Sequence, residues 1–242
     1  MLRSGNPALR NDAFISTRAA SGENAMTIQG TANKALILLG VAAIAFAWAW
    51  SRPSMGLTLL LPALILGFIA SLVTIFKKEW APVSAPIYAI LEGVVLGAIS
   101  MVFERSYPGI AKQAILLTFG VLFSLLAVYK SGLIKPTQNF KLGVFAATGG
   151  IGIFYLVSMI AGFFGVHFSI LYGNGPLAIG FSVVVVIIAA LNLVMDFDFI
   201  EQGAEQGAPK YMEWYGAFSL MVTLVWLYME ILRLLSKLQS RR

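Results

Sequence analysis

The chain has 242 residues, of which 59% are hydrophobic and only 12% are charged, about half the charged fraction typical of soluble domains. So few charges exclude a soluble globular domain, and the high hydrophobicity excludes an intrinsically disordered chain. A chain of this kind must satisfy its backbone hydrogen bonds within lipid, which leaves a helical bundle or a closed barrel.

Residues 1–33 are polar and carry several charges among Ser, Asn, Gly and Ala. They lack the compact basic region and apolar core of a secretory signal peptide. We therefore expect a flexible polar tail over 1–33, followed by one transmembrane domain over 34–240.

Seven apolar segments follow the tail, and each approaches the length of about 20 residues that a helix needs to cross a bilayer. None shows the strict alternation of a barrel strand. The sequence therefore predicts an all-α, polytopic membrane protein with a bundle of seven transmembrane helices. The predicted spans are 35–51, 54–76, 82–104, 109–130, 142–165, 176–197 and 211–235.

Basic residues lie mostly at the ends of these spans. With alternating crossings, ten of the 17 lie on the side of the N-terminus and seven on the other side. An excess of Lys and Arg marks the cytoplasmic side. We expect a multi-pass protein of the cell membrane, in bacteria the inner membrane, with a cytoplasmic N-terminus.

The residue types present exclude much catalytic chemistry. The chain contains no cysteine and one histidine, His167, which falls in the connection between the fifth and sixth spans. Thiolate chemistry and most zinc sites are thereby excluded, and the sequence contains no phosphate-binding loop, metalloprotease motif or dinucleotide fingerprint. We expect neither enzymatic activity nor a cofactor, and the scattered basic residues do not favour nucleic acid as a partner.

Two glycines in the third span, Gly93 and Gly97, are four residues apart. Small residues at this spacing let helices approach closely in lipid. The pattern predicts that this face contacts another helix.

Glu92 lies at the middle of the third span. Because an ionised carboxylate in hydrocarbon is costly, such a residue faces the bundle interior or a water-filled cavity. One interpretation is a relay for cations or protons. The other is a neutral acid that hydrogen-bonds to a neighbouring helix.

The end of the sixth span is acidic, with Asp196 and Asp198, and Asn192 lies one helical turn before Asp196. Glu213 opens the seventh span on the same side of the membrane. A short connection can bring Asp196 and Glu213 together, and two adjacent acids share a proton. This arrangement would form a pH-sensitive gate, whereas the alternative is a solvated acidic connection.

Other acids have simpler interpretations. Glu201 and Glu205 are expected to be solvated, and Glu230 is expected to pair with Arg233, three residues later on the same helix. No Lys or Arg is centred in a span, so the predicted interior contains only acids. Such an interior suits cations or protons.

The arrangement resembles the Bax inhibitor-1 family in its bacterial, YccA-like branch. The resemblance is carried by residues 91–100 (LEGVVLGAIS), by the acidic end of the sixth span at 195–198 (MDFD), and by residues 6–9 (NPAL). It implies a pH-sensitive calcium leak with a central seventh helix. It also implies that Asp196 pairs with a second acid near Leu220 or Met221. Neither of these residues is acidic, which makes Glu213 the candidate replacement.

Three functions are therefore considered from the sequence. The first is a passive cation leak, and the second is a non-conducting regulator that binds a membrane protease or another membrane protein. The third is a proton-coupled transporter, which would favour an internal repeat that the sequence does not show. Expected partners are the lipid bilayer, calcium ions or protons, and a membrane protease. The candidate residues for an ion path or pH sensing are Asp196, Glu213, Glu92, Asp198 and Asn192.

Overall fold

A computed structural model describes residues 25–134 and 136–241. In this part of the chain the regular structure is helical, and the only strand-like pairing is one isolated bridge between Ala25 and Pro209. Seven helices are long and apolar enough to cross a membrane, which confirms the predicted all-α class. The helices are α2 (Ile28–Ser51), α3 (Pro53–Phe76), η1 (Lys78–Trp80), α4 (Ala81–Ser106), α5 (Ile110–Lys130), α6 (Gln138–Phe163), α7 (Ser169–Tyr172), α8 (Pro176–Glu205) and α9 (Met212–Gln239).

The first long helix begins at Ile28, earlier than the predicted start at residue 35. Thr27 caps it, because its hydroxyl accepts a hydrogen bond from the backbone N–H of Gly30 at 2.9 Å. Residues 28–33 are therefore helical and do not belong to a flexible tail. The rest of the predicted tail, including the segment 6–9, lies outside the described residues.

Helix α8 extends to Glu205, beyond the predicted end at residue 197. It stops where Gly207 adopts a positive φ of 63°, a conformation that favours glycine. Glu201 and Glu205 are exposed, yet they lie on this helix and not in a connecting loop.

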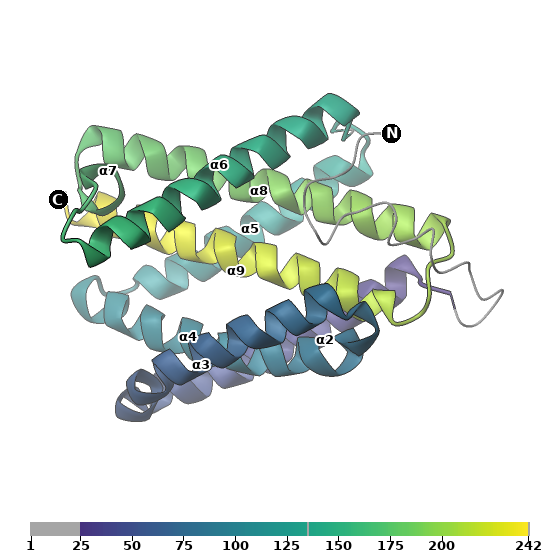
Figure 1. The fold of residues 1–242 in the computed structure, drawn as a ribbon, viewed down its shortest axis with the longest axis horizontal. Coiled ribbons are helices and arrows are strands. Elements are labelled where there is room, and N and C mark those ends of the chain that lie inside the picture. The colour runs from purple at the N-terminus through teal and green to yellow at the C-terminus, as the bar shows by residue number, and fades with distance from the viewer. Residues whose placement is uncertain (1–24, 135, 242) are drawn as a thin grey trace. The chain divides into compact units, whose positions relative to one another are not determined.

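The chain forms two compact units, and each unit combines two stretches of sequence. Among the described residues, the first unit contains 25–106 and 196–222, and the second contains 107–134, 136–195 and 223–241. Helices α8 and α9, green and yellow in Figure 1, therefore contribute one part to each unit. The acids at the end of α8 and the start of α9 belong to the first unit.

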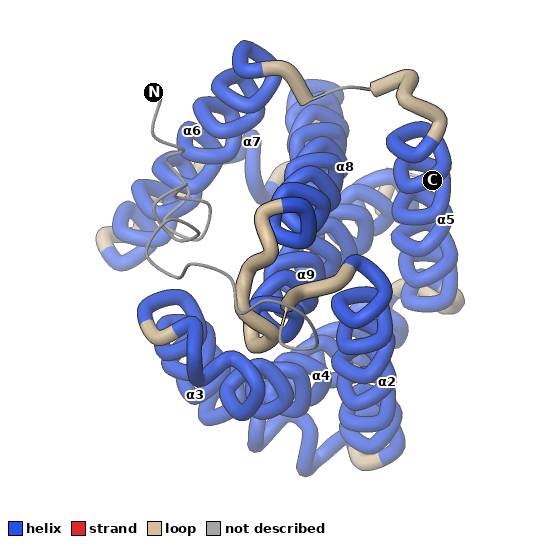
Figure 2. Tube along the Cα trace, turned by 90° about the vertical axis from the view of Figure 1, so that its right-hand side faces the viewer, coloured by secondary structure: helices blue, strands red, loops and turns tan. Residues whose placement is uncertain are grey.

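In the first unit, α4 packs against both α2 and α3 (Figure 2). The two glycines of α4 allow the approach of α2. A Cβ atom at Gly97 would lie 2.6 Å from the carbonyl oxygen of Phe46, and one at Gly93 would lie 2.8 Å from the Cβ of Ala45. The predicted helix contact of this face is thus confirmed, and α2 is the partner.

The second unit packs α6 against the first part of α8 through aromatic rings. The Phe154 ring lies 5.4 Å from that of Phe181 and 5.8 Å from that of Phe168, measured between centroids. Other large apolar side chains of this unit are exposed, among them Phe123, Ile153 and Leu156. Such faces suit contact with lipid, whose tails are as apolar as the side chains themselves.

Candidate functional site

Asp196 is only 4% exposed and is the α8 residue at which the second stretch of the first unit begins. The Ser219 hydroxyl of α9 donates a hydrogen bond of 2.7 Å to Asp196 Oδ1. A carboxyl in a membrane-spanning helix that faces another helix, and not lipid, is the arrangement expected of a functional acid. Asp196 and Ser219 therefore form the centre of the candidate site.

Glu213 is fully buried at the first turn of α9, and its partners come from the N-terminal end of α2. Its Oε1 accepts hydrogen bonds from the Thr27 backbone at 3.0 Å and from the Thr27 hydroxyl at 2.9 Å. Oε2 forms an ion pair with Lys34, and Lys210 lies 3.1 Å from Oε1. Two lysines and the positive end of the α2 dipole thus compensate the carboxylate charge.

The Glu213 carboxylate lies directly against Gly30 of α2. A Cβ atom at position 30 would overlap the carboxylate, so any larger residue there would force the Glu213 side chain to move. From the sequence we expected Glu213 to lie beside Asp196. In the structure the two acids have different partners. Ser219 lies six positions after Glu213, about 9 Å farther along the axis of α9, so Asp196 contacts α9 at a different height from Glu213.

The other two candidates on α8 make local contacts. Asp198 Oδ2 accepts a hydrogen bond of 2.7 Å from the Gln202 side chain on the next turn. Asn192 belongs to the second unit, where its amide donates to the Thr148 hydroxyl of α6 and to the Ile188 carbonyl, each at 2.8 Å. Asn192 thus ties α8 to α6.

Glu92 is half-buried near the middle of α4, and its carboxyl lies against α3. Its Oε2 would be 3.7 Å from a Cβ atom at Gly67, an ordinary van der Waals distance, so the carboxyl lies beside this position of α3. One turn earlier, the Tyr88 ring packs edge-on against Phe218 of α9, with 5.1 Å between centroids. Among the described residues, none donates a hydrogen bond to Glu92 and no three His, Asp or Glu side chains gather as metal ligands.

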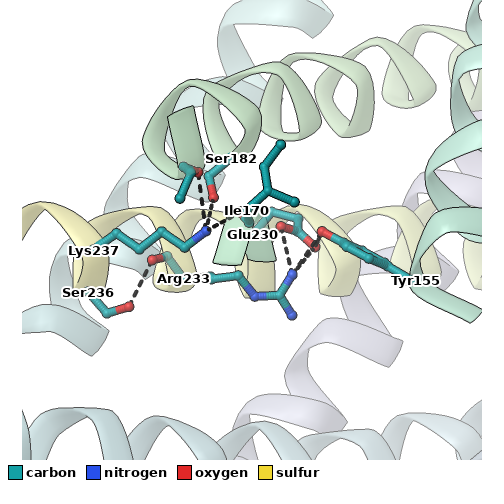
Figure 3. Close-up of polar contacts among 8 residues, drawn as sticks. Tyr155, Ile170, Ser182, Glu230, Arg233, Ser236 and Lys237 are labelled. Atoms are coloured by element: carbon teal, nitrogen blue, oxygen red, sulfur yellow. Dashed lines mark hydrogen bonds and ion pairs between the residues drawn. The ribbon is translucent and has the colours of Figure 1, made fainter. Parts of the chain in front are cut away.

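The second unit contains a polar cluster around Glu230, which is 2% exposed (Figure 3). Arg233 Nη1 lies 3.1 Å from Glu230 Oε1, which confirms the predicted ion pair within α9. The structure adds Tyr155 of α6, whose hydroxyl donates to Glu230 at 2.9 Å and accepts from Arg233 at 2.8 Å. The ion pair therefore also fastens α9 to α6.

Lys237 lies in the last turn of α9, yet its side chain is buried. It is 4% exposed, and its ammonium group donates to the Ser182 hydroxyl at 2.9 Å and to the Ala178 carbonyl at 3.2 Å, both on α8. A longer contact of 3.5 Å reaches the Ile170 carbonyl of α7 (Figure 3). Lys237 thus joins three helices of the second unit through neutral oxygen atoms.

The sequence contains part of the signal for these contacts. Glu230, Arg233 and Lys237 follow at spacings of three and four, which places them on one face of a helix. No comparable spacing connects Ser219 with Asp196, or Thr27 with Glu213, because these partners lie on different helices. Those contacts depend on the tertiary packing.

Seven long apolar helices that enclose several acids define a multi-pass helical membrane protein. The sequence model of the Bax inhibitor 1 like family matches residues 6–240, nearly the whole chain. The protein therefore belongs to this family, as its sequence motifs led us to expect. No curated protein and no solved structure gives a significant match to the sequence.

Proposed function

We propose that this protein is a passive leak for cations, calcium in particular, and that protonation of Asp196 controls the leak. The proposal rests on membership of the Bax inhibitor 1 like family and on one observation, the buried Asp196 carboxyl between two membrane-spanning helices. An ionised carboxylate attracts a cation, whereas a protonated one does not. The charge of this group is therefore suited to control cation flow.

Ser219 stands beside Leu220, the position near which the family resemblance places a second acid. Its hydroxyl donates a hydrogen bond of 2.7 Å to Asp196 Oδ1. A hydroxyl carries no charge at neutral pH, so the proposed gate contains one titrating carboxyl from this pair and not two. Glu213, which is bound to Lys34 and Lys210, serves a separate contact in this proposal.

Glu92 supplies a second acid in the same unit, near the middle of α4. Its carboxyl has no hydrogen-bond donor among the described residues, so its oxygens are available to a passing cation or proton. We assign it an accessory role, in which it lowers the electrostatic barrier at the centre of the membrane.

The proposed location is the cell membrane, with the N-terminus in the cytoplasm. Ten basic residues lie on the N-terminal side and seven on the opposite side. This excess is the imbalance expected when the N-terminal side is cytoplasmic.

Flux in reconstituted liposomes tests the proposal. The purified protein is expected to admit calcium above the level of empty vesicles, with a rate that depends on pH. Asp196→Asn should abolish this pH dependence, whereas the exposed control Glu205→Gln on the same helix should retain it. Ser219→Asp should change the pH at which the flux rises, because two adjacent acids share a proton.

The absence of calcium flux above empty vesicles at every pH would overturn the proposal. If the wild type and Asp196→Asn show a calcium flux with the same pH dependence, the role of Asp196 is overturned but the proposed leak stands.

A further inference from the structure

The three residues before α2 form a strap across the connection between α8 and α9. Ala25 pairs with Pro209 in an antiparallel bridge, and the Met26 N–H donates to the Ala208 carbonyl at 2.6 Å. Thr27 then binds Glu213 through its backbone and its hydroxyl. Three successive residues are thus attached to the N-terminal side of α9 by main-chain and charged contacts.

The strap places the Met26 side chain in an apolar core of the first unit. Met26 is 2% exposed and packs in one cluster with Phe199 and Ile200 of α8 and with Tyr215 of α9. Its Cε would lie 3.5 Å from a Cβ atom at Gly216, an ordinary van der Waals distance, so Met26 packs directly beside this position of α9. Met26 therefore fills the space between the ends of α8 and α9.

This core lies directly beside the candidate gate. Phe199 and Ile200 are three and four residues beyond Asp196 on α8, and Gly216 is three residues before Ser219 on α9. Each distance is about one helical turn. Met26 and its neighbours therefore lie about one helical turn from the Asp196–Ser219 pair, toward the connection between α8 and α9.

Charged groups hold the strap in position. Lys34 binds Glu213 and also lies 5.6 Å from the centroid of the Trp214 ring, and Lys210 contacts Glu213 from the connection itself. Lys78 lies over the opposite part of this core, 5.5 Å from the centroid of the Tyr215 ring. These charged contacts, together with the main-chain bonds of residues 25 and 26 and the buried Met26 side chain, hold the strap against the start of α9.

We infer that residues 25–27 are an autoinhibitory strap, which closes the route to Asp196 from the N-terminal side when Met26 is seated and opens it when the strap leaves. This inference rests on the proposed cation leak, because it describes how that leak is regulated. The blocking segment is part of the chain itself, and it binds to the apolar core formed by α8 and α9.

A reversible cross-link tests the strap, and the chain suits this experiment because it contains no cysteine. The double variant Ala25→Cys/Pro209→Cys places two thiols at the bridge, where the Cα separation typical of antiparallel pairs falls within the range of a disulfide. In liposomes, the oxidised double variant should leak less calcium than the same protein after reduction with dithiothreitol. The wild type should not respond to dithiothreitol.

Removal of the Met26 side chain should have the opposite effect. Met26→Ala should raise the calcium flux about fivefold or more, the change expected when a closed state loses one well-packed contact. Met55→Ala is the matched control, because Met55 is 54% exposed on α3. Its flux should equal that of the wild type.

Failure of the strap and failure of the leak give different results. If the wild type conducts calcium but neither cross-linking nor Met26→Ala changes the flux, the strap is overturned and the leak stands. Failure of the disulfide to form on oxidation would also overturn the strap. If no flux appears in any protein, including reduced samples and Met26→Ala, the leak itself is overturned. A measurement of melting temperature on each variant confirms that the folds being compared are intact.

Discussion

Glu213 in the first turn of α9 accepts two hydrogen bonds from Thr27, the residue that caps α2. Thr27 thus has two functions, since its hydroxyl also accepts from the Gly30 N–H and starts the helix. The contact joins residues 186 positions apart in the chain and fastens the beginning of α2 to the beginning of α9. The resulting clamp is made of Thr27, Lys34, Lys210 and Glu213.

The clamp should contribute measurably to stability. Glu213→Gln retains the shape of the side chain but leaves the half-buried Lys34 without its opposite charge. We expect a loss of about 1–3 kcal/mol in the free energy of unfolding, the range for hydrogen bonds that involve a charged group. Thermal unfolding in detergent measures this change. The exposed Glu205→Gln should leave the melting temperature unchanged, and equal effects of the two variants would contradict the clamp.

The packing of α4 against α2 makes a second prediction. Gly97→Ala places a Cβ atom 2.6 Å from the Phe46 carbonyl oxygen, so the helices must move apart. We expect a destabilisation of about 1–3 kcal/mol, as for an overpacked core. Gly120→Ala on α5 has no atom within 4 Å of the new carbon and should be neutral or slightly stabilising, because alanine favours helix. A melting temperature that is the same for both variants would show that Gly97 is not in a close helix contact.

Glu92 should be reactive toward a hydrophobic carbodiimide, which modifies protonated carboxyl groups within membranes. The carboxyl is half-buried and lacks a hydrogen-bond donor among the described residues. Mass spectrometry of the labelled protein should locate the adduct on the α4 peptide, and Glu92→Gln should abolish it. Labelling of this peptide that persists in Glu92→Gln would contradict the assignment.

Lys237 should hold the short helix α7 and the start of α8. Lys237→Met removes the donor to the Ala178 and Ile170 carbonyls and leaves these acceptors without that partner. We expect faster hydrogen exchange over residues 166–178 and a destabilisation of about 1–3 kcal/mol. The exposed Lys130→Met on α5 serves as the control. Unchanged exchange over 166–178 would show that Lys237 does not anchor this segment.

Sequence periodicity and composition were sufficient for the class of fold. The seven spans, the close helix contact at Gly93 and Gly97, and the ion pair of Glu230 with Arg233 all follow from patterns within single helices. Helix ends were less predictable. We predicted a tail over residues 28–33 because these residues are polar, and hydropathy does not reveal that Thr27 caps a helix that begins there.

The partners of the acids required the tertiary structure. Hydropathy locates Asp196, Glu213 and Glu92 along the chain, but helix rotation and packing decide what each carboxyl faces. The sequence places Asp196 and Glu213 on the same side of the membrane, yet one binds a serine on α9 and the other binds the start of α2. An acid within an apolar span needs a partner for its charge, because an isolated charge in hydrocarbon is costly. Only the arrangement of helices in space determines which distant residue is that partner.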